Sequence, residues 1–467
     1  MRRHHTPFIL IGLVATVAVF GAGLAALSHA LEGQTRQLAD GSLLQLEALT
    51  YERQHRLMER SWWQKLLRPI LPQHLQAGGE YSFNSDTDQL AFWLFRRGIP
   101  AGKNWQACAA AAVDEHGCRV GGGAAAAVVP LPFGAPSTRA AIYGALDAFP
   151  RRAGTFRLCV FANNPTSQVA EFRVANPRPG PYPTWTPDAL PITRRQGELQ
   201  VTLSALTTNL SWPRLLQSQP PLPPSELEKY TATVAFYRPW SWMLSAPNQA
   251  SWTRASFLIL DRSRPSRDWL LDGVTVMDAT RNILPHRVQD LFSCLRGGSD
   301  RAGHLWFAFH SGLCPRESAW KVRAYLPYVG PADPRRADLR WAVRQVQVPP
   351  PGDMTALDAT TTQQAITLRL RGLFGPGAPS LIPLRGPVKS MRVRVEVHRP
   401  AGQRLRLLAR ATDEGGREVG VPSSSVFRGD EREWWPTLTV PPGVKTLTLT
   451  FAAWKERVFE FLARPSS

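Results

Sequence analysis

Arginine side chains follow a two-residue period in the C-terminal part of the sequence. In RVRVEVHR, Arg392 and Arg394 alternate with valines, and in RLRLLAR, Arg404 and Arg406 alternate with leucines. Successive side chains of a strand point to opposite faces of a sheet, so each segment predicts one apolar face and one basic face. If the two strands are neighbours, these arginines form one surface suited to bidentate contacts with phosphate or carboxylate groups. The alternative is an ordinary solvent-facing side of an antiparallel sheet.

Tryptophans beside proline, serine or charged residues form a second candidate site. Trp240 lies in RPWSWML, and Trp434 and Trp435 lie in EREWWPTL. An indole ring offers a large apolar face and one polar N–H group, and an exposed face of this kind stacks on sugar rings. These residues therefore indicate carbohydrate binding. The alternative is that they fill the core of a β-sandwich.

Motifs for several common kinds of catalysis are missing from the sequence. It contains no G-x-S-x-G, no H-E-x-x-H and no P-loop. His304 and His310 would lie about 20 Å apart along a strand, too far to share a metal ion. Residues 84–88 offer side-chain oxygens at the alternating positions that a calcium loop uses, and a turn before a strand explains them as well. We expect no metal and no cofactor, although the paired carboxylates of a glycoside hydrolase would come from distant strands and show no motif.

The five cysteines are spaced in a way that fits disulfides better than a zinc site, because no C-x-x-C is present. The natural local pairs are Cys108 with Cys118 and Cys294 with Cys314, and both would form in an oxidising compartment. Cys159 lies in the apolar segment TFRLCVF and is predicted to be a core thiol.

The N-terminal segment predicts a membrane helix. Residues 8–28 carry no charged side chain, and 21 residues at about 1.5 Å each span about 30 Å, the thickness of the hydrocarbon layer. The head before them carries Arg2 and Arg3, so it should stay cytoplasmic and the rest of the chain should lie outside, in the periplasm or at the cell surface. A cleaved signal peptide is the alternative, because Ser28 and Ala30 are small residues of the kind a signal peptidase reads.

The net charge of +19 gives the exported part a surface that attracts anions. Because the chain is predicted to be exported, nucleic acid is excluded as a partner, and anionic envelope polymers or other envelope proteins are expected instead. An apolar stripe with two tryptophans near residues 59–75 predicts an amphipathic helix, which lies either in the headgroup region of the membrane or against the first domain.

Proline and glycine punctuate the exported part, and the segments between them are short and alternate in polarity. This pattern, with turn signals about every 8–12 residues, is typical of sandwiches and barrels. We predict an all-β protein with several antiparallel β-sandwich domains (immunoglobulin-like or jelly-roll-like) in tandem behind one N-terminal transmembrane helix. Proline-rich segments place the boundaries, which gives a head and membrane helix (1–30) and three β domains (31–177, 178–350 and 351–467). The last strands of the second and third domains are predicted at 340–348 and 458–462.

We therefore expect a membrane-anchored extracytoplasmic protein that acts as a binding or structural module, of the adhesion or scaffold kind, rather than an enzyme. The alternative is a carbohydrate-binding accessory protein or a glycoside hydrolase with dispersed carboxylates. The membrane is a partner through the N-terminal helix in either case.

Overall fold

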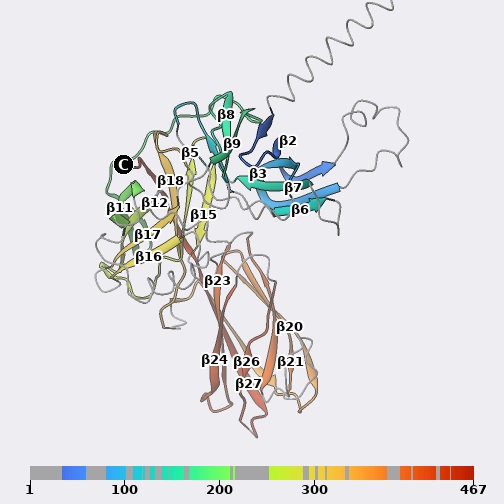
Figure 1. The fold of residues 1–467 in the computed structure, drawn as a ribbon. Coiled ribbons are helices and arrows are strands. Elements are labelled where there is room, and N and C mark those ends of the chain that lie inside the picture. Colours follow the sequence, from blue (N-terminus) through green and yellow to red (C-terminus); the bar gives the residue numbers. More distant parts are fainter. Residues whose placement is uncertain are drawn as a thin grey trace, which may run out of the picture.

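The computed structural model of the chain describes residues 34–58, 80–100, 109–117, 119–120, 127–131, 139–146, 148–161, 168–210, 214–215, 252–287, 294–299, 303–310, 313–331, 336–375, 390–400, 403–427, 432–441 and 443–466. Nearly every element in these ranges is a β-strand, and the neighbouring strands of every sheet are antiparallel (Figure 1). The predicted all-β class is therefore confirmed.

The N-terminal sheet pair is made of two sheets that share one apolar cluster. The first sheet has the order β1 (Thr35–Gln37), β2 (Leu43–Met58), β3 (Glu80–Arg97), β7 (Arg139–Leu146), β6 (Ala127–Leu131). The second has the order β5 (Arg119–Val120), β4 (Ala109–Val113), β8 (Thr155–Phe161), β9 (Gln168–Ala175). Phe92 of β3 and Phe172 of β9 are both fully buried in the shared cluster, so alternate side chains of the two sheets face each other.

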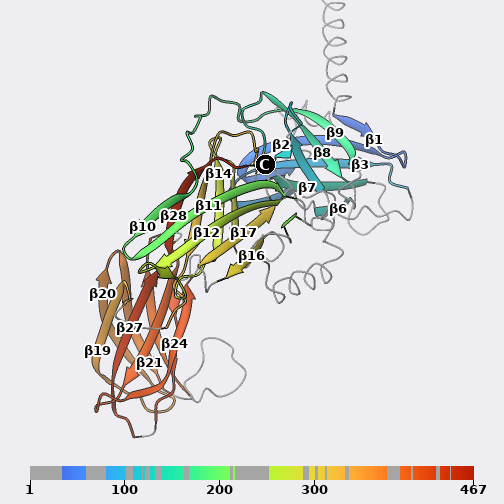
Figure 2. The ribbon, with the colours of Figure 1, turned by 90° about the vertical axis from the view of Figure 1, so that its left-hand side faces the viewer.

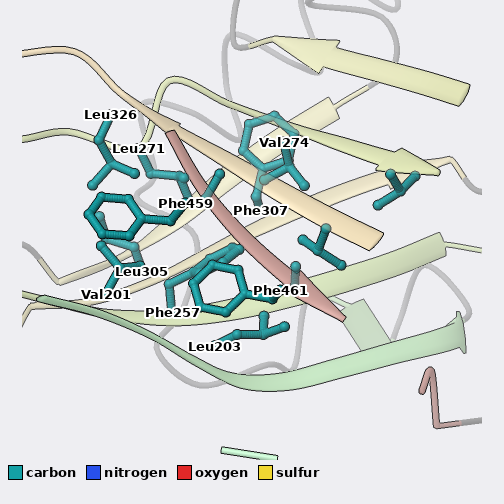
Figure 3. Close-up of a cluster of buried hydrophobic side chains, with 14 of the residues drawn as sticks. Val201, Leu203, Phe257, Leu271, Val274, Leu305, Phe307, Leu326, Phe459 and Phe461 are labelled. Atoms are coloured by element: carbon teal, nitrogen blue, oxygen red, sulfur yellow. The ribbon is translucent and has the colours of Figure 1, made fainter. Parts of the chain in front are cut away.

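The middle sheet pair follows the same plan. One sheet has the order β10 (Ile192–Gln196), β11 (Leu199–Leu210), β12 (Trp252–Asp261), β17 (His304–His310), β16 (Cys294–Ser299), with β13 (Arg264–Pro265) beside β12. The other has the order β15 (Ile283–Arg287), β14 (Gly273–Asp278), β18 (Trp320–Leu326), β28 (Arg457–Ala463). Figure 3 shows Phe257 and Phe307 from the first sheet in one cluster with Phe459 and Phe461 of β28 from the second.

The C-terminal sheet pair contains the predicted arginine strands. One sheet has the order β19 (Leu339–Gln347), β27 (Thr446–Lys455), β23 (Leu405–Thr412), β24 (Glu418–Phe427). The other has the order β20 (Met354–Gln363), β21 (Ile366–Phe374), β22 (Met391–His398), β25 (Glu433–Trp434), with β26 (Thr437–Leu438) also beside β22. The valines of β22 are buried in the cluster between the sheets, and the side chains between them face outward, as the two-residue period predicts.

Two strands pair differently from what their order in the chain indicates. The predicted strand at 340–348 was assigned to the second domain, but β19 pairs with β27 of the C-terminal sheet pair. The predicted strand at 458–462 was assigned to the third domain, but β28 pairs with β18 of the middle sheet pair. Figure 2 shows β28 beside β10 and β11, away from β27, which precedes it in the chain. Chain order misleads here because antiparallel pairing joins segments that are distant in sequence.

One local prediction is also corrected, and others lie outside the described residues. Residues 84–88, read as a calcium loop or a turn, lie within β3, where Asp88 pairs with Arg53 at 3.0 Å. The predicted membrane helix at 8–28 and the amphipathic helix near 59–75 fall outside the described part of the chain. Within the described part, no helix has the length and apolar character needed to cross a membrane.

Candidate functional site

The arginines predicted to form one surface lie on two different sheets. Arg392 and Arg394 are on β22, whereas Arg406 is on β23 and Arg404 directly precedes it. Strand β22 belongs to the sheet of β20 and β21, and β23 belongs to the opposite sheet. The alternation of arginine with apolar residues is confirmed in both strands, but the two sets point away from each other across the shared core.

On the first of these sheets, arginines and carboxylates alternate. Arg394 Nη2 lies 2.5 Å from Glu433 Oε1, and Arg371 Nε on the neighbouring β21 lies 2.8 Å from Glu396 Oε1. The hydrogen bond from Arg371 holds the pKa of Glu396 below its ordinary value. An incoming anion would therefore meet carboxylates as well as guanidinium groups, so the face is less basic than the sequence indicates.

Arg404 and Arg406 contact the middle sheet pair instead of solvent. Arg404 Nη1 donates to Asp272 Oδ2 at 2.6 Å, and Arg406 Nη1 donates to the Gly330 carbonyl at 2.7 Å. The Arg406 guanidinium also lies over the rings of Tyr328 and Trp454, 5.8 and 5.7 Å from their centroids. These distances are in the range of cation–π attraction. Both arginines thus hold two sheet pairs together.

The contact between the middle and C-terminal sheet pairs contains further aromatic contacts and ion pairs. We call it the second junction, because it follows the contact between the N-terminal and middle sheet pairs, which is the first junction. Tyr328 and Trp454 are stacked with ring centroids 5.3 Å apart, and both are buried. Arg336 forms ion pairs with Asp261 and Asp268. The chain passes from one sheet pair to the other twice, between β18 and β19 and again at residue 456 between β27 and β28. Two covalent crossings and a buried aromatic stack fix the relative position of the two sheet pairs.

The tryptophans predicted to bind sugar divide between core and surface. Trp434 is 5 % exposed and packs in the C-terminal core with its ring centroid 6.2 Å from that of Phe451, so it is not available for stacking on a ligand. Trp435 is half-buried, with its ring 5.3 Å from that of Phe374 and under the Arg394 guanidinium. Trp240 lies outside the described residues.

The structure tests the cysteine predictions for Cys159 alone. Cys159 is a buried thiol on β8, as predicted. Cys314 is half-buried. Its predicted bridge to Cys294 stays a prediction, because the side chain of Cys294 is outside the described set, and the same holds for Cys108 and Cys118.

A cavity of about 420 Å³ lies at the first junction, where the N-terminal and middle sheet pairs meet. We refer to it as the junction cavity. Its walls come mainly from the turn between β4 and β5 (114–116), the segment before β8 (149–153), the turn between β14 and β15 (278–282) and the loop before β18 (314–318), with Val120 and Thr184 also in contact. The volume is within the range of small-molecule sites, about 300–1,000 Å³.

Asp278 shapes the turn that forms one wall of the junction cavity. Its side chain is 1 % exposed, and burial raises its pKa above the ordinary value. Oδ1 accepts hydrogen bonds from the backbone N and the hydroxyl of Thr280 at 2.9 and 2.7 Å, and Oδ2 accepts from Asn282 Nδ2 at 2.9 Å. Because donors occupy both oxygens, Asp278 stabilises the turn and is not poised as a general base.

The turn is joined to the N-terminal sheet pair by reciprocal hydrogen bonds. Asn282 Nδ2 donates to the Phe149 carbonyl at 3.0 Å, and the Phe149 backbone N donates to Asn282 Oδ1 at 3.2 Å. Arg151 Nη1 donates to the Thr280 carbonyl at 3.1 Å. The Asn282 amide thus pairs with the Phe149 backbone as a neighbouring strand would, through one donated and one accepted hydrogen bond. These bonds fix the geometry of the first junction.

Arginines provide the basic groups of the junction cavity. Arg152 forms a bidentate pair with Glu317, at 2.8 and 3.0 Å, and the hydrogen bond to this carboxylate raises the pKa of the guanidinium. Arg151 is 6 % exposed and lies over the rings of Tyr51 and Phe149 at 4.9 and 4.8 Å. Its Nε atom is buried and has no hydrogen-bond acceptor among the described residues.

Sequence reasoning did not single out the junction cavity. The only local signal was the run Asp278-Ala279-Thr280-Arg281-Asn282 after a predicted strand, since aspartate and asparagine side chains bond to backbone groups two residues on. Nothing in the sequence around Arg151 indicates its burial. Among the described residues, no group of three or more His, Cys, Asp or Glu side chains is arranged to hold a metal ion.

The chain was also compared with known proteins. No known family matches it, and no curated protein is similar to it in sequence.

Proposed function

We propose that the chain is a membrane-anchored extracytoplasmic protein of the cell envelope that serves as an adhesion or scaffold module. In this proposal the apolar run at residues 8–28 is the anchor. The three sheet pairs are tandem sandwich domains of the immunoglobulin-like or jelly-roll-like kind, and they present surfaces to other envelope proteins or to anionic envelope polymers.

The observation that carries the proposal is the construction of the second junction. Ordinary domain linkers leave neighbouring domains free to move. Here β27 and β28 are separated by a single residue, although they belong to different sheet pairs, and Arg404 and Arg406 bond across the same contact. A protein that holds its partners at a fixed separation requires such a junction, whereas a flexible string of binding modules does not.

The residues predicted to bind ligands give further support. Arg404, Arg406 and Trp434 are used for packing between or within the sheet pairs. These three side chains therefore contribute to a stiff framework, whereas Arg392 and Arg394 remain on the outer face of β22, which we propose as a surface for partners.

The test is a measurement of topology on the full chain. Alkaline phosphatase fused after Ser467 becomes active only when it is exported to an oxidising compartment. We expect an active fusion that stays with the membrane after a high-salt wash. The control is the same fusion with Val17→Arg and Val19→Arg, which places two charges in the apolar run and should abolish insertion. An inactive parent fusion, or activity unchanged by the two arginines, would contradict the proposal.

A further inference from the structure

The chain that joins the N-terminal sheet pair to the middle one carries a proline at every second position of residues 177–183. A proline ring fixes its own φ at about −65° and restricts the residue before it to extended conformations. Because each residue of this run is a proline or precedes one, covalent geometry favours a polyproline II helix. In the structure, residues 179–187 lie outside the strands, and all four prolines are exposed. We refer to residues 177–187 as the proline segment.

The protein holds one face of the proline segment and leaves two open. A polyproline II helix has three residues per turn, so residues three apart share a face. Tyr182 and Trp185 are three apart, and both are half-buried. Pro177 and Pro183 share a second face, Pro181 lies on the third, and these prolines are exposed. The rings on the two open faces form an apolar ridge on the surface.

Hydrogen bonds from both sheet pairs fix the backbone of the proline segment. Arg152 Nη1 donates to the Tyr182 carbonyl at 3.0 Å, and Nη2 donates to the Pro183 carbonyl at 2.8 Å. From the middle sheet pair, Ser318 Oγ donates to the Trp185 carbonyl at 2.7 Å. The segment therefore has its shape before any partner arrives, and binding it costs little conformational entropy.

The first junction does not need these prolines as a spacer. Asn282 and the Phe149 backbone already join the two sheet pairs through reciprocal hydrogen bonds. A flexible linker would therefore be sufficient across a contact whose geometry is fixed. Prolines that served packing would be buried, whereas those of residues 177–183 are exposed. Recognition by a partner explains the exposed ridge, which neither spacing nor packing requires.

We propose that the proline segment is a docking site for a partner protein with a groove lined by aromatic side chains. Grooves of this kind bind preformed polyproline II helices. Arg178 is exposed beside the ridge, with its guanidinium 5.7 Å from the centroid of the Tyr51 ring. The rim of the groove is therefore expected to carry carboxylates. This inference rests on the proposed scaffold role for the need of a partner, but the binding itself does not require the membrane anchor.

The test is photocrosslinking from an open face of the proline segment. The full chain, purified in detergent with p-benzoylphenylalanine in place of Thr186, is irradiated in a detergent extract of whole cells that produce the protein. Thr186 is exposed and shares the face of Pro183. We expect an adduct whose crosslinked site, located by mass spectrometry, lies in a groove of Tyr, Trp or Phe side chains. A synthetic peptide of residues 176–187 should compete with the adduct, and the same peptide with its prolines replaced by alanine should not.

Variants separate recognition from folding. Pro181→Ala combined with Pro183→Ala should lower the affinity for the crosslinked partner about tenfold, because ring contacts and preorganisation are both lost. Arg178→Glu should lower it as well, through repulsion from the acidic rim. Pro265→Ala combined with Pro400→Ala is the matched control, since both are exposed prolines outside the segment. An unchanged unfolding temperature shows that each variant is folded.

Four results would overturn the proposal: no adduct, an adduct that the peptide does not reduce, a crosslinked site without aromatic side chains, or equal affinity in the two double-proline variants. A partner that passes these tests but resides in the cytoplasm would support the docking site and contradict the proposed location. The two proposals therefore fail separately.

Discussion

Arg404 of the C-terminal sheet pair donates a hydrogen bond of 2.6 Å to Asp272 of the middle sheet pair. The two side chains are only 16 % and 18 % exposed, so water screens the pair weakly. Arg404→Met keeps the length of the side chain but leaves the Asp272 carboxylate without this partner. We expect the free energy of unfolding to fall by about 1–3 kcal/mol, measured by urea denaturation followed by tryptophan fluorescence.

An exposed ion pair provides the control for this substitution. Arg369 is paired with Asp358 at 2.8 Å on the outer face of β21, where the carboxylate is 65 % exposed. Arg369→Met should leave the free energy of unfolding almost unchanged, because water and salt screen an exposed ion pair. Equal losses of unfolding free energy in Arg404→Met and Arg369→Met would show that burial of the ion pair at the second junction adds no stability.

Arg406→Lys tests whether the planar guanidinium is needed at the second junction. Lysine keeps the charge but cannot lie flat over Tyr328 and Trp454 while it donates to the Gly330 carbonyl. We expect faster hydrogen–deuterium exchange in residues 327–330 and 453–457, where the chain crosses the junction, with little change elsewhere. Arg410→Lys is the control, because Arg410 faces Glu418 on its own sheet. The prediction fails if both variants exchange at the wild-type rate in these segments.

Asp278 gives a prediction about pH. Burial raises the pKa of its carboxyl in the folded protein, and repulsion from Glu317 adds to the effect. The folded state therefore binds this proton more tightly than the unfolded state. The stability that it contributes is full below the ordinary value of 3.8 and is lost as the pH rises through the raised pKa.

Asp278→Asn removes this titration and isolates its contribution. The difference in free energy of unfolding, wild type minus variant, should decrease as the pH rises from 4 toward neutrality, because the wild type loses the stability that the Asp278 proton contributes. The other titrating groups cancel in this difference. Denaturation curves at several pH values measure it. A difference that grows with pH would mean that the folded-state pKa lies below the ordinary value.

The sequence predicted the features that depend on residues close together in the chain, and it missed those that depend on contacts between distant segments. The period-2 alternation of β22 and β23 is local, so the outward positions of Arg392, Arg394 and Arg406 could be read from it. Which strands lie side by side depends on contacts between segments far apart in the chain. For this reason the arginines were expected on one surface, although a core separates the two strands.

The junction cavity could not be predicted from the sequence for the same reason. Its walls come from several separate segments between residues 114 and 318, and none of them carries a recognisable motif. The burial of Arg151 depends on Tyr51, about 100 residues earlier in the chain, and on the Thr280 carbonyl, 129 residues later. Composition indicated a basic surface, but the pairing of Arg152 with Glu317 could only be seen in the fold.

The two adjacent tryptophans should respond very differently to truncation. Trp434→Ala removes a core side chain that packs against Phe451, and should cost about 3–5 kcal/mol of stability. Trp435→Ala removes a half-buried ring beside Phe374, and should cost less than half as much. Thermal and urea denaturation compare them directly. A Trp434→Ala variant as stable as the wild type would contradict the place of Trp434 in the core.

The outer face of β21 and β22 is where binding to anionic envelope polymers can be tested. Arg394 is already paired with Glu433, so the carboxylate competes with any incoming anion. Glu433→Gln should therefore strengthen the binding of the full chain in detergent to immobilised alginate, and the gain should disappear at high salt because screening weakens exposed charges. Arg392→Glu combined with Arg394→Glu should weaken the binding. The control is Arg194→Glu with Arg195→Glu, which makes the same charge change on the exposed side of β10. If this control pair weakens binding as much as the β22 pair, the attraction comes from net charge alone, and the face of β21 and β22 has no particular role.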